Sequence, residues 1–437
     1  MNFGMRALAR FSCFIISAFC LHCGDSIADE FRFFGGISGE FPQPKNVDCI
    51  ADISRQSLTS ANTISLSITR KVDAPQLLRA IEALGTEVLS LYAPVGKSES
   101  MSVDEIIRDL AQNQSPLRYL SLNYLSGKHG WNAAVVAKLP KLEYLEIHGG
   151  ELDVESARWL AKLPKLRTLL IRHRTAITDA VLSELSTSRI QAIGIGGKDV
   201  TGVGFASWAE SETLTSVDVS GVSLSLDGLK AISKLSHLRH LDMSATGISI
   251  GLPNVLSELQ SLESLVIGGT RGSGVDDTLM ETVARLPELK HLDVMASDIS
   301  GRGLQILSQS ARLESLMLAE VRLDPDAVTA IGRMTTLKSL NLVATQVNDE
   351  ALLQFLGLTS LQCLNLQSTD VSAKGLDVLK RFKLLCWLNI RYTKIRPDSI
   401  SELGKITTLE ELIVSGPGWD MAAMEHLRAA LPGCLVE

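Results

Sequence analysis

The stretch "LESLMLAEVRLDPDAVTAIGRMTT" occupies residues 313–336, and "LKSLNLVATQVNDEALLQFLGLTS" follows it directly at 337–360. Both stretches place leucine at their first, fourth and sixth positions. In the first stretch, Leu316 and Leu318 alternate with Ser315 and other residues that tolerate solvent. An alternation of period two predicts a strand with one buried face, so each stretch is expected to begin with a strand.

A short helix is predicted to follow each strand. Asp324 provides a side-chain acceptor for the first turn, and Pro325 suits the first helical position. Val328 and Ile331 are three residues apart and give the helix one apolar face. Residues of the capping type recur at Asp153, Thr178, Ser300, Asn348 and Ser372. Each unit therefore reads as strand, turn, helix and return.

The pattern L-x-x-L-x-L repeats along most of the chain. It starts at Leu117, Leu142, Leu166, Ile190, Leu214, Leu238, Leu262, Leu289, Leu313, Leu337, Leu361, Leu385 and Leu409. A single unit cannot bury its own apolar residues, but stacked units bury them against one another and pair their strands in parallel. Because helices are wider than strands, we expect a curved α/β solenoid with a parallel sheet on its concave face and short helices on its convex face.

The repeats resemble the leucine-rich repeat family, most closely a 24-residue bacterial form found in planctomycete-like secreted proteins. The segments "LNLVATQVNDEALLQFL" and "LNLQSTDVSAKGLDVL" carry the resemblance best. Members of this family mostly bind other proteins, so the resemblance implies a binding function. Where many members have Asn at the ninth position, this chain has Thr246, Thr270, Ser297, Thr345, Thr369 and Thr393. We expect these hydroxyls to form a structural ladder with buried backbone groups.

The N-terminus reads as a secretory signal. Arg6 and Arg10 precede an apolar run at 11–21, and Ser26 and Ala28 give a small-x-small cleavage site. We therefore expect a secreted or periplasmic protein, with an uncleaved anchor as the alternative. The predicted organisation is a signal peptide at 1–28, a non-repetitive lead-in and N-terminal cap at 29–62, degenerate repeats at 63–116, and the repeat array with a C-terminal half-repeat cap at 117–437.

The amino-acid composition limits the classes of partner that the chain is expected to bind. The net charge is −7 and no basic run is present, which argues against nucleic acid. Of the seven cysteines, three lie within the signal, and the remainder form no C-x-x-C pair of the kind that binds zinc. Cys363 and Cys386 could lie on neighbouring strands, and whether they pair is left open.

The third, fifth, seventh and eighth positions of each repeat are expected to be exposed on the concave face. Aromatic residues and arginine gather there near both ends of the array, and such residues dominate binding hot spots. The N-terminal repeats also place Asn123, Glu146 and His173 at these positions. The predicted ligand-binding residues are Tyr119, Tyr124, Tyr144, His148, Arg172, Asp218, His240, Asp242, His291, Asp293, Trp387, Arg391 and Tyr392.

Catalytic motifs are absent from the sequence: it has no H-E-x-x-H, no G-x-S-x-G and no phosphate-binding loop. We therefore predict a non-catalytic protein without cofactor or metal that binds a protein partner on its concave face. A glycan-binding protein of the cell envelope is the alternative, because aromatic and amide side chains also suit sugars. A metal-dependent hydrolase using Asp218, His240 and Asp242 is a more distant alternative.

Overall fold

The computed structural model describes residues 63–67, 88–92, 103–125, 131–172, 175–197, 199–247, 252–269 and 274–437. The predicted signal peptide and lead-in, together with His173 and Thr270, lie outside the described residues, as does the side chain of Tyr124. The described chain divides into two compact units, and the boundary falls between Leu241 and Asp242. The N-terminal unit and the C-terminal unit are described separately below.

Parallel strands form the backbone of both units, and their order in the sheet follows the chain. The strands are β1 Thr63–Ser67, β2 Val88–Tyr92, β3 Tyr119–Leu125, β4 Tyr144–Gly149, β5 Thr168–Ile171, β6 Ala192–Ile195, β7 Ser216–Asp218, β8 His240–Asp242, β9 Ser264–Val266, β10 His291–Asp293, β11 Ser315–Met317, β12 Ser339–Asn341, β13 Cys363–Asn365, β14 Trp387–Asn389, β15 Glu411–Ile413 and β16 Leu435–Val436.

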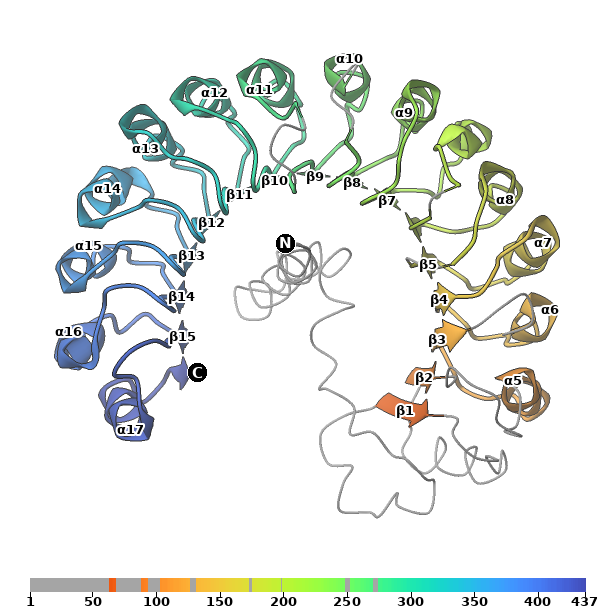
Figure 1. Cartoon of the computed structure of the whole chain (residues 1–437), viewed down its shortest axis with the longest axis horizontal. Coiled ribbons are helices and arrows are strands. Elements are labelled where there is room, and N and C mark those ends of the chain that lie inside the picture. Colours follow the sequence, from red (N-terminus) through yellow and green to blue (C-terminus); the bar gives the residue numbers. More distant parts are fainter. Residues whose placement is uncertain are drawn as a thin grey trace, which may run out of the picture. The chain divides into compact units, whose positions relative to one another are not determined.

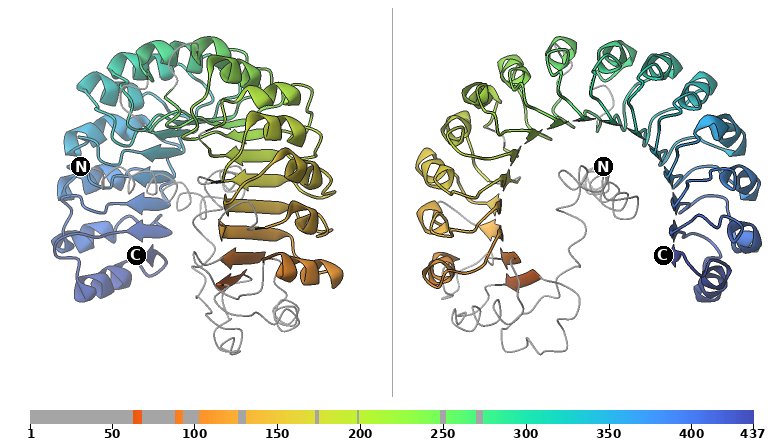
Figure 2. Two further views of the ribbon diagram at one scale, coloured as in Figure 1. Left: turned by 45° about the vertical axis from the view of Figure 1, so that its right-hand side comes forward. Right: turned by 180° about the vertical axis from the view of Figure 1, so that it is seen from behind.

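Short helices follow most strands. The α-helices are α5 Val103–Gln112, α6 Ala133–Val136, α7 Val154–Ala161, α8 Asp179–Leu185, α9 Leu226–Ser233, α10 Leu252–Leu256, α11 Asp277–Val283, α12 Gly301–Leu307, α13 Pro325–Ile331, α14 Asp349–Gln354, α15 Leu376–Leu379, α16 Ile400–Leu403 and α17 Met421–Ala430. Helices of the tighter 3-10 type are η3 Val203–Trp208, η4 Phe355–Gly357, η5 Ala373–Gly375 and η6 Pro397–Ser399. In each unit these helices lie on one side of the sheet, as Figures 1 and 2 show. We call the other side the strand face.

Leucine columns form the core between the sheet and the helices. In the C-terminal unit, Leu316 on β11 is in register with Leu292 on β10 and Leu340 on β12. In the N-terminal unit, Leu145 on β4 is likewise in register with Leu169 on β5. These side chains are buried, and because each leucine packs against its counterpart in the next repeat, every repeat depends on its neighbours. The α/β solenoid predicted from the leucine spacing is confirmed.

The helix caps largely agree with the sequence. The side chains of Asp153, Ser300, Asp324, Asn348 and Ser372 each accept a backbone N–H from the first turn of the following helix. Thr178 also precedes a helix, but its side chain makes no capping hydrogen bond, so that prediction is wrong in detail. The next residue, Asp179, contacts the neighbouring repeat: it accepts the N–H groups of Thr201 and Gly204.

The ninth-position hydroxyls form the expected ladder. The side chains of Thr246, Thr345, Thr369 and Thr393 each donate to the carbonyl oxygen three residues earlier, at 2.6–2.8 Å. Ser297 makes no such bond with the described part of the chain. The residue just before this position adopts a left-handed conformation in successive repeats. These residues are Gly221, Ala245, Gly269, Ala296, Glu320, Ala344, Ser368 and Tyr392.

Candidate functional site: a carboxylate-centred network on the strand face

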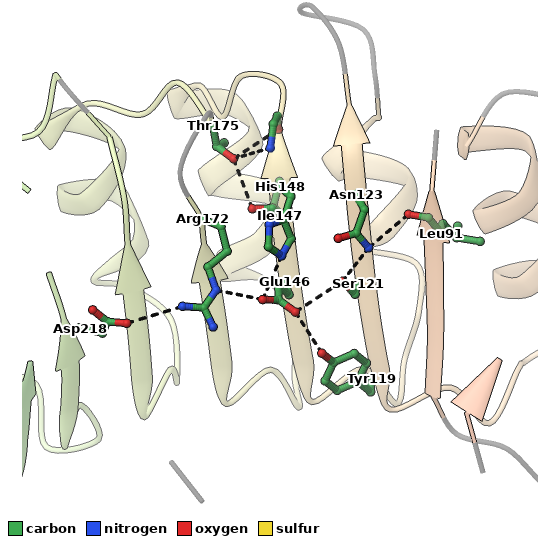
Figure 3. A network of polar contacts seen from close by, with 11 residues as sticks. Leu91, Tyr119, Ser121, Asn123, Glu146, Ile147, His148, Arg172, Thr175 and Asp218 are labelled. Carbon is green, nitrogen blue, oxygen red and sulfur yellow. Dashed lines mark hydrogen bonds and ion pairs between the residues drawn. The ribbon is translucent and has the colours of Figure 1, made fainter. Parts of the chain in front are cut away.

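The strand face of the N-terminal unit carries a polar network centred on Glu146 of β4 (Figure 3). One carboxylate oxygen, Oε1, lies 2.9 Å from Arg172 Nε and 3.0 Å from His148 Nε2. The other, Oε2, accepts hydrogen bonds from the Tyr119 hydroxyl at 3.0 Å and from Ser121 Oγ at 3.4 Å. The partners come from β3, from β4 itself and from the segment after β5. Four donors therefore occupy the four acceptor directions of one carboxylate.

Further hydrogen bonds extend this network along the sheet. Asn123 Nδ2 donates to Ser121 Oγ at 3.0 Å and to the Leu91 carbonyl of β2 at 3.4 Å. On the other side, the Thr175 hydroxyl lies 3.2 Å from the carbonyl oxygen of Ile147 and fixes the end of β4 beside His148. The strands that carry the network are thus held at both ends of the cluster (Figure 3).

Two tyrosine rings stack next to the carboxylate. Tyr119 on β3 and Tyr144 on β4 are in register, and their ring centroids lie 4.2 Å apart with an interplanar angle of 8°. Parallel strands place in-register side chains about 4.8 Å apart, which brings flat rings into contact. The inner face of each ring is therefore covered by the other ring.

Arg172 reaches from the end of β5 across β6 to β7. Its Nη1 atom lies 3.7 Å from Asp218 Oδ2, while its Nε atom binds Glu146. The strand between them has glycine at the relevant position: Gly194 of β6 is in register with Leu170 and Asp218. A Cβ atom on Gly194 would come within 2.8 Å of Leu170 Cδ2 and 3.6 Å of Asp218 Oδ2. The missing side chain therefore leaves room for the residues on either side.

Electrostatics keep the network in one charge state. Burial would raise the pKa of Glu146, but the hydrogen bond from His148 and the positive charge of Arg172 outweigh burial and lower it to about 2. Burial also opposes the charged form of Arg172, and the negative charge of Glu146 keeps its pKa above the ordinary value. Burial and the charge of Glu146 raise the pKa values of Tyr119 and Tyr144. Glu146 is thus ionised and both tyrosines are neutral at neutral pH.

Sequence reasoning found most members of this network but not its centre. Tyr119, Tyr144, His148 and Arg172 were predicted as one cluster, and the structure brings them together. Glu146 was noted only as an exposed residue, whereas its side chain is 11% exposed. Its place in register between a serine of β3 and a leucine of β5 was a usable signal, because an acid flanked by uncharged neighbours on its own face must find partners elsewhere.

Asp218 was assigned in the sequence to a different cluster, with His240, Asp242, His291 and Asp293. The structure gives the aspartates of this cluster a shared structural role. At the fifth position of six repeats, a side-chain oxygen accepts the backbone N–H two residues later, at 2.8–3.1 Å. The residues that do so are Asp218, Asp242, Asp293, Asn341, Asn365 and Asn389. This recurring turn explains why aspartate and asparagine occupy the position.

Three of the predicted site residues are less exposed to solvent than the sequence predicts. His291, Asp293 and Trp387 were expected to be exposed, but they are 4%, 6% and 1% exposed. In-register neighbours on both sides account for this: Asp293 lies between Val266 and Met317, and side chains about 4.8 Å apart shield one another. Trp387 likewise lies between Cys363 and Glu411, which are also buried.

The remaining predicted residues are accessible to different degrees. Tyr392 is exposed, as expected, with 62% of its surface open to solvent. Arg391, His240 and Asp242 are half-buried. Cys363 and Cys386 are not joined by a disulfide. Within the described residues, no group of three or more His, Cys, Asp or Glu side chains could hold a metal ion.

Comparison with known families agrees with this architecture. The model of the leucine-rich repeat region matches residues 212–357, and a leucine-rich repeat model matches residues 357–380. The matched residues include Leu292, Leu316 and Leu340 of the leucine columns and Thr246, Thr345 and Thr369 of the hydroxyl ladder. The chain is a leucine-rich repeat protein. Leucine-rich repeat domains commonly mediate protein–protein interactions, through the extended surfaces that stacked repeats create.

Two solved leucine-rich repeat structures are similar to this chain. An internalin of Listeria monocytogenes matches with 19% identity and a TM-score of 0.47, over 76% of this chain and 93% of the internalin. A leucine-rich repeat protein of Leptospira interrogans matches with 16% identity and a TM-score of 0.45, over 87% of this chain and 97% of its own. No curated protein matches the sequence. None of the helices in the described ranges is long and apolar enough to cross a membrane.

Proposed function

We propose that this chain is a non-catalytic, secreted or periplasmic binding protein that recognises a protein partner on the strand face of its N-terminal unit. The observation that carries the proposal is the Glu146 network. Arg172 and His148 are 30% and 37% exposed, yet Glu146 fixes the position of both. A partner that binds side chains already held in place loses little conformational entropy in doing so.

The residue types also favour recognition. Tyrosine and arginine dominate the binding energy of protein interfaces, because they combine a large contact area with hydrogen-bonding groups. In this chain, Tyr119, Tyr144 and Arg172 lie within one connected cluster. The guanidinium of Arg172 has five N–H donors, and its contacts with Glu146 and Asp218 leave others for a partner.

The chemistry of the network supports binding over catalysis. A general base needs an available lone pair and a pKa near the working pH. Glu146 has donors on both oxygens and a pKa of about 2. Asp218 accepts the Ser220 N–H through Oδ1 and faces Arg172 through Oδ2. Neither carboxylate is therefore arranged to take a proton from a substrate.

A protein partner fits better than a glycan at this cluster. Sugars stack on the open faces of aromatic rings, but the inner faces of Tyr119 and Tyr144 are stacked on each other. The cluster presents hydrogen-bond donors with fixed directions beside the charged guanidinium of Arg172. Such donors suit the carbonyl and carboxylate groups of a polypeptide. Glycan binding therefore remains the second candidate.

The proposal is tested by quantitative capture from an envelope and secreted fraction on the immobilised chain. We expect a protein enriched by the wild type to be lost with His148→Ala and with Arg172→Gln. His148 is at the rim of the cluster, so its replacement should leave the fold intact, which a thermal melt checks. Arg158→Gln is the matched control, because Arg158 is an exposed arginine on α7, on the helix side of the same unit. Equal capture by all variants would overturn the proposal.

A further inference from the structure

The strand face of the C-terminal unit carries a row of side-chain amides. Asn341, Asn365 and Asn389 are in register on β12, β13 and β14. Each Oδ1 atom accepts the backbone N–H two residues later, at 3.0, 3.1 and 3.0 Å. Because a backbone N–H can only donate, the amide oxygen must face the backbone in each case. The NH₂ group of each asparagine is therefore directed away from that turn, and all three side chains are buried.

The residues next to the asparagine row supply further hydrogen-bond donors and few free acceptors. Asn389 Nδ2 donates to Gln367 Oε1 at 3.3 Å, so the acceptor of Gln367 is used and its NH₂ group remains. Arg391, two residues after Asn389, contributes a guanidinium and forms no ion pair within the described ranges. Both Gln367 and Arg391 are partly exposed on the strand face, where a ligand can reach them.

Two buried donors in this row have no acceptor. Asn365 Nδ2 and Arg391 Nε are closed to solvent and make no hydrogen bond within the described chain. An unsatisfied buried donor costs about 1–3 kcal/mol. The guanidinium of Arg391 is partly exposed, so a ligand that binds it can offset part of this cost, whereas Asn365 is fully buried.

The charge of the surrounding surface agrees with an anionic acceptor. The third, fifth and seventh positions of the three repeats that contain β12–β14 include no acid. They are Ser339, Asn341, Val343, Cys363, Asn365, Gln367, Trp387, Asn389 and Arg391. The carboxylate nearest in register is Glu411 of β15, beside Trp387 at the start of the strand rather than beside Arg391. Arg172 in the other unit differs, because Glu146 and Asp218 contact it from two sides.

We propose that Arg391 and Gln367, beside the buried asparagine row of β12–β14, bind a carboxylate of an acidic peptide segment. A carboxylate has two oxygens that accept a forked pair of bonds from a guanidinium, and it has acceptor capacity left for the amide of Gln367. Tyr392 follows Arg391 and is 62% exposed, so its ring is available to cover the aliphatic part of an acidic side chain. This assignment extends the proposed protein-binding function to a second surface.

The test measures fluorescence anisotropy of a labelled tetraglutamate peptide titrated with the full chain, and tetraglutamine is the uncharged probe. Because the chain has a net charge of −7, nonspecific attraction of an acidic peptide is disfavoured. We expect tetraglutamate to bind and tetraglutamine not to bind. Arg391→Gln should weaken tetraglutamate binding about tenfold or more, the size expected for a charge-assisted hydrogen-bond pair.

Arg381→Gln is the matched control, because Arg381 is exposed in the segment after α15 and carries the same charge. It should change the dissociation constant less than about twofold, as expected of an exposed charge. Absence of tetraglutamate binding, equal loss in both arginine variants, or binding of a uronate oligosaccharide without the peptide would each overturn the assignment. Because these variants lie outside the Glu146 cluster, their failure is distinguishable from a failure of the capture experiment.

Discussion

The carboxylate of Glu146 gains more from its partners than it loses on burial. Burial alone would favour the protonated acid, yet His148 and Arg172 lower the pKa of Glu146 from 4.5 to about 2. A shift of that size corresponds to about 3–4 kcal/mol of stabilisation of the folded state at neutral pH, at roughly 1.4 kcal/mol per unit. One side chain thus both stabilises the repeats around it and fixes the residues that we assign to recognition.

Replacing Glu146 with glutamine should destabilise the fold by about 2–4 kcal/mol at pH 7, because Arg172 loses its buried counter-ion. Since the folded pKa lies below the ordinary one, the contribution is complete above pH 4.5 and is lost as the pH falls toward 2. Urea unfolding of the wild type and Glu146→Gln at pH 7 and pH 3 measures this difference.

Glu143→Gln is the control, because Glu143 forms an exposed ion pair with Arg118. Its cost should stay below about 1 kcal/mol. A difference between wild type and Glu146→Gln that grows at acid pH would contradict the role given to Glu146.

Asp293 shows the opposite behaviour. Its burial raises its pKa to about 6, and the hydrogen bond from the Met295 N–H only partly opposes the shift. The folded state therefore holds its proton at higher pH than the unfolded state does. Stability from this residue is present below pH 4 and falls as the pH rises through 6.

Asp293→Asn should stabilise the protein by on the order of 2 kcal/mol at pH 7, because asparagine keeps the acceptor for Met295 without a buried charge. The equivalent residue two repeats later is already asparagine, Asn341. The stabilisation should vanish below pH 4, which thermal melts at both pH values test. The converse variant Asn341→Asp should destabilise at pH 7. If both variants have the same melting temperature as the wild type at pH 7, a buried charge at this position does not lower the stability of the fold.

At the scale of the elements, each strand from β7 to β14 ends in a turn whose eighth repeat position is left-handed. Residues other than glycine occupy it in six repeats, including Ala344 with a φ of 54°. A left-handed residue with a Cβ atom costs about 1–2 kcal/mol, and a β-branched side chain costs more. The turn is kept because the side chains on either side of it hold the backbone: Asn341 accepts the Val343 N–H, and Thr345 donates to the Leu342 carbonyl.

Ala344→Val should therefore destabilise the chain by about 2 kcal/mol or more, although Ala344 is exposed and no packing is lost. Ala344→Gly should have little effect, since relief of strain offsets the greater freedom of glycine in the unfolded chain. Chemical denaturation measures both. Equal stability of the valine and glycine variants would show that the left-handed turn does not limit this position.

The sequence predicted the strands and helices better than it predicted the candidate site, and the reason is physical. Leu316 and Leu340 point into the core because alternation along a strand is a local property, and a capping acid such as Asp324 acts within its own helix turn. Three of the four partners of Glu146, in contrast, lie 25–27 residues away in neighbouring repeats, and their contacts depend on side-chain rotamers. The burial of Trp387 depends on the neighbours at its register position, which the repeat pattern does not specify.

At the scale of the whole molecule, stability is shared between neighbouring repeats. Leu340 is fully buried and lies in register between Leu316 and Leu364. A charge at this position would enter a core to which three repeats contribute, without a partner. The repeats on either side should therefore lose structure together.

Leu340→Asp should lower the melting temperature in one cooperative step and remove amide protection from β11, β12 and β13 alike. Hydrogen exchange followed by mass spectrometry resolves these strands. Lys338→Asp is the control, since Lys338 precedes β12 and is 35% exposed in an ion pair with Glu314. Loss of protection confined to β12 would show that the repeats are energetically independent.

Recognition through the strand face is the central claim, and hydrogen exchange of the chain with its captured partner tests it most directly. The account predicts slower exchange in β3, β4 and the residues after β5 when the partner is bound, and no change in α6, α7 or α8. Protection of those helices with unchanged exchange around Tyr119, Glu146 and Arg172 would contradict it.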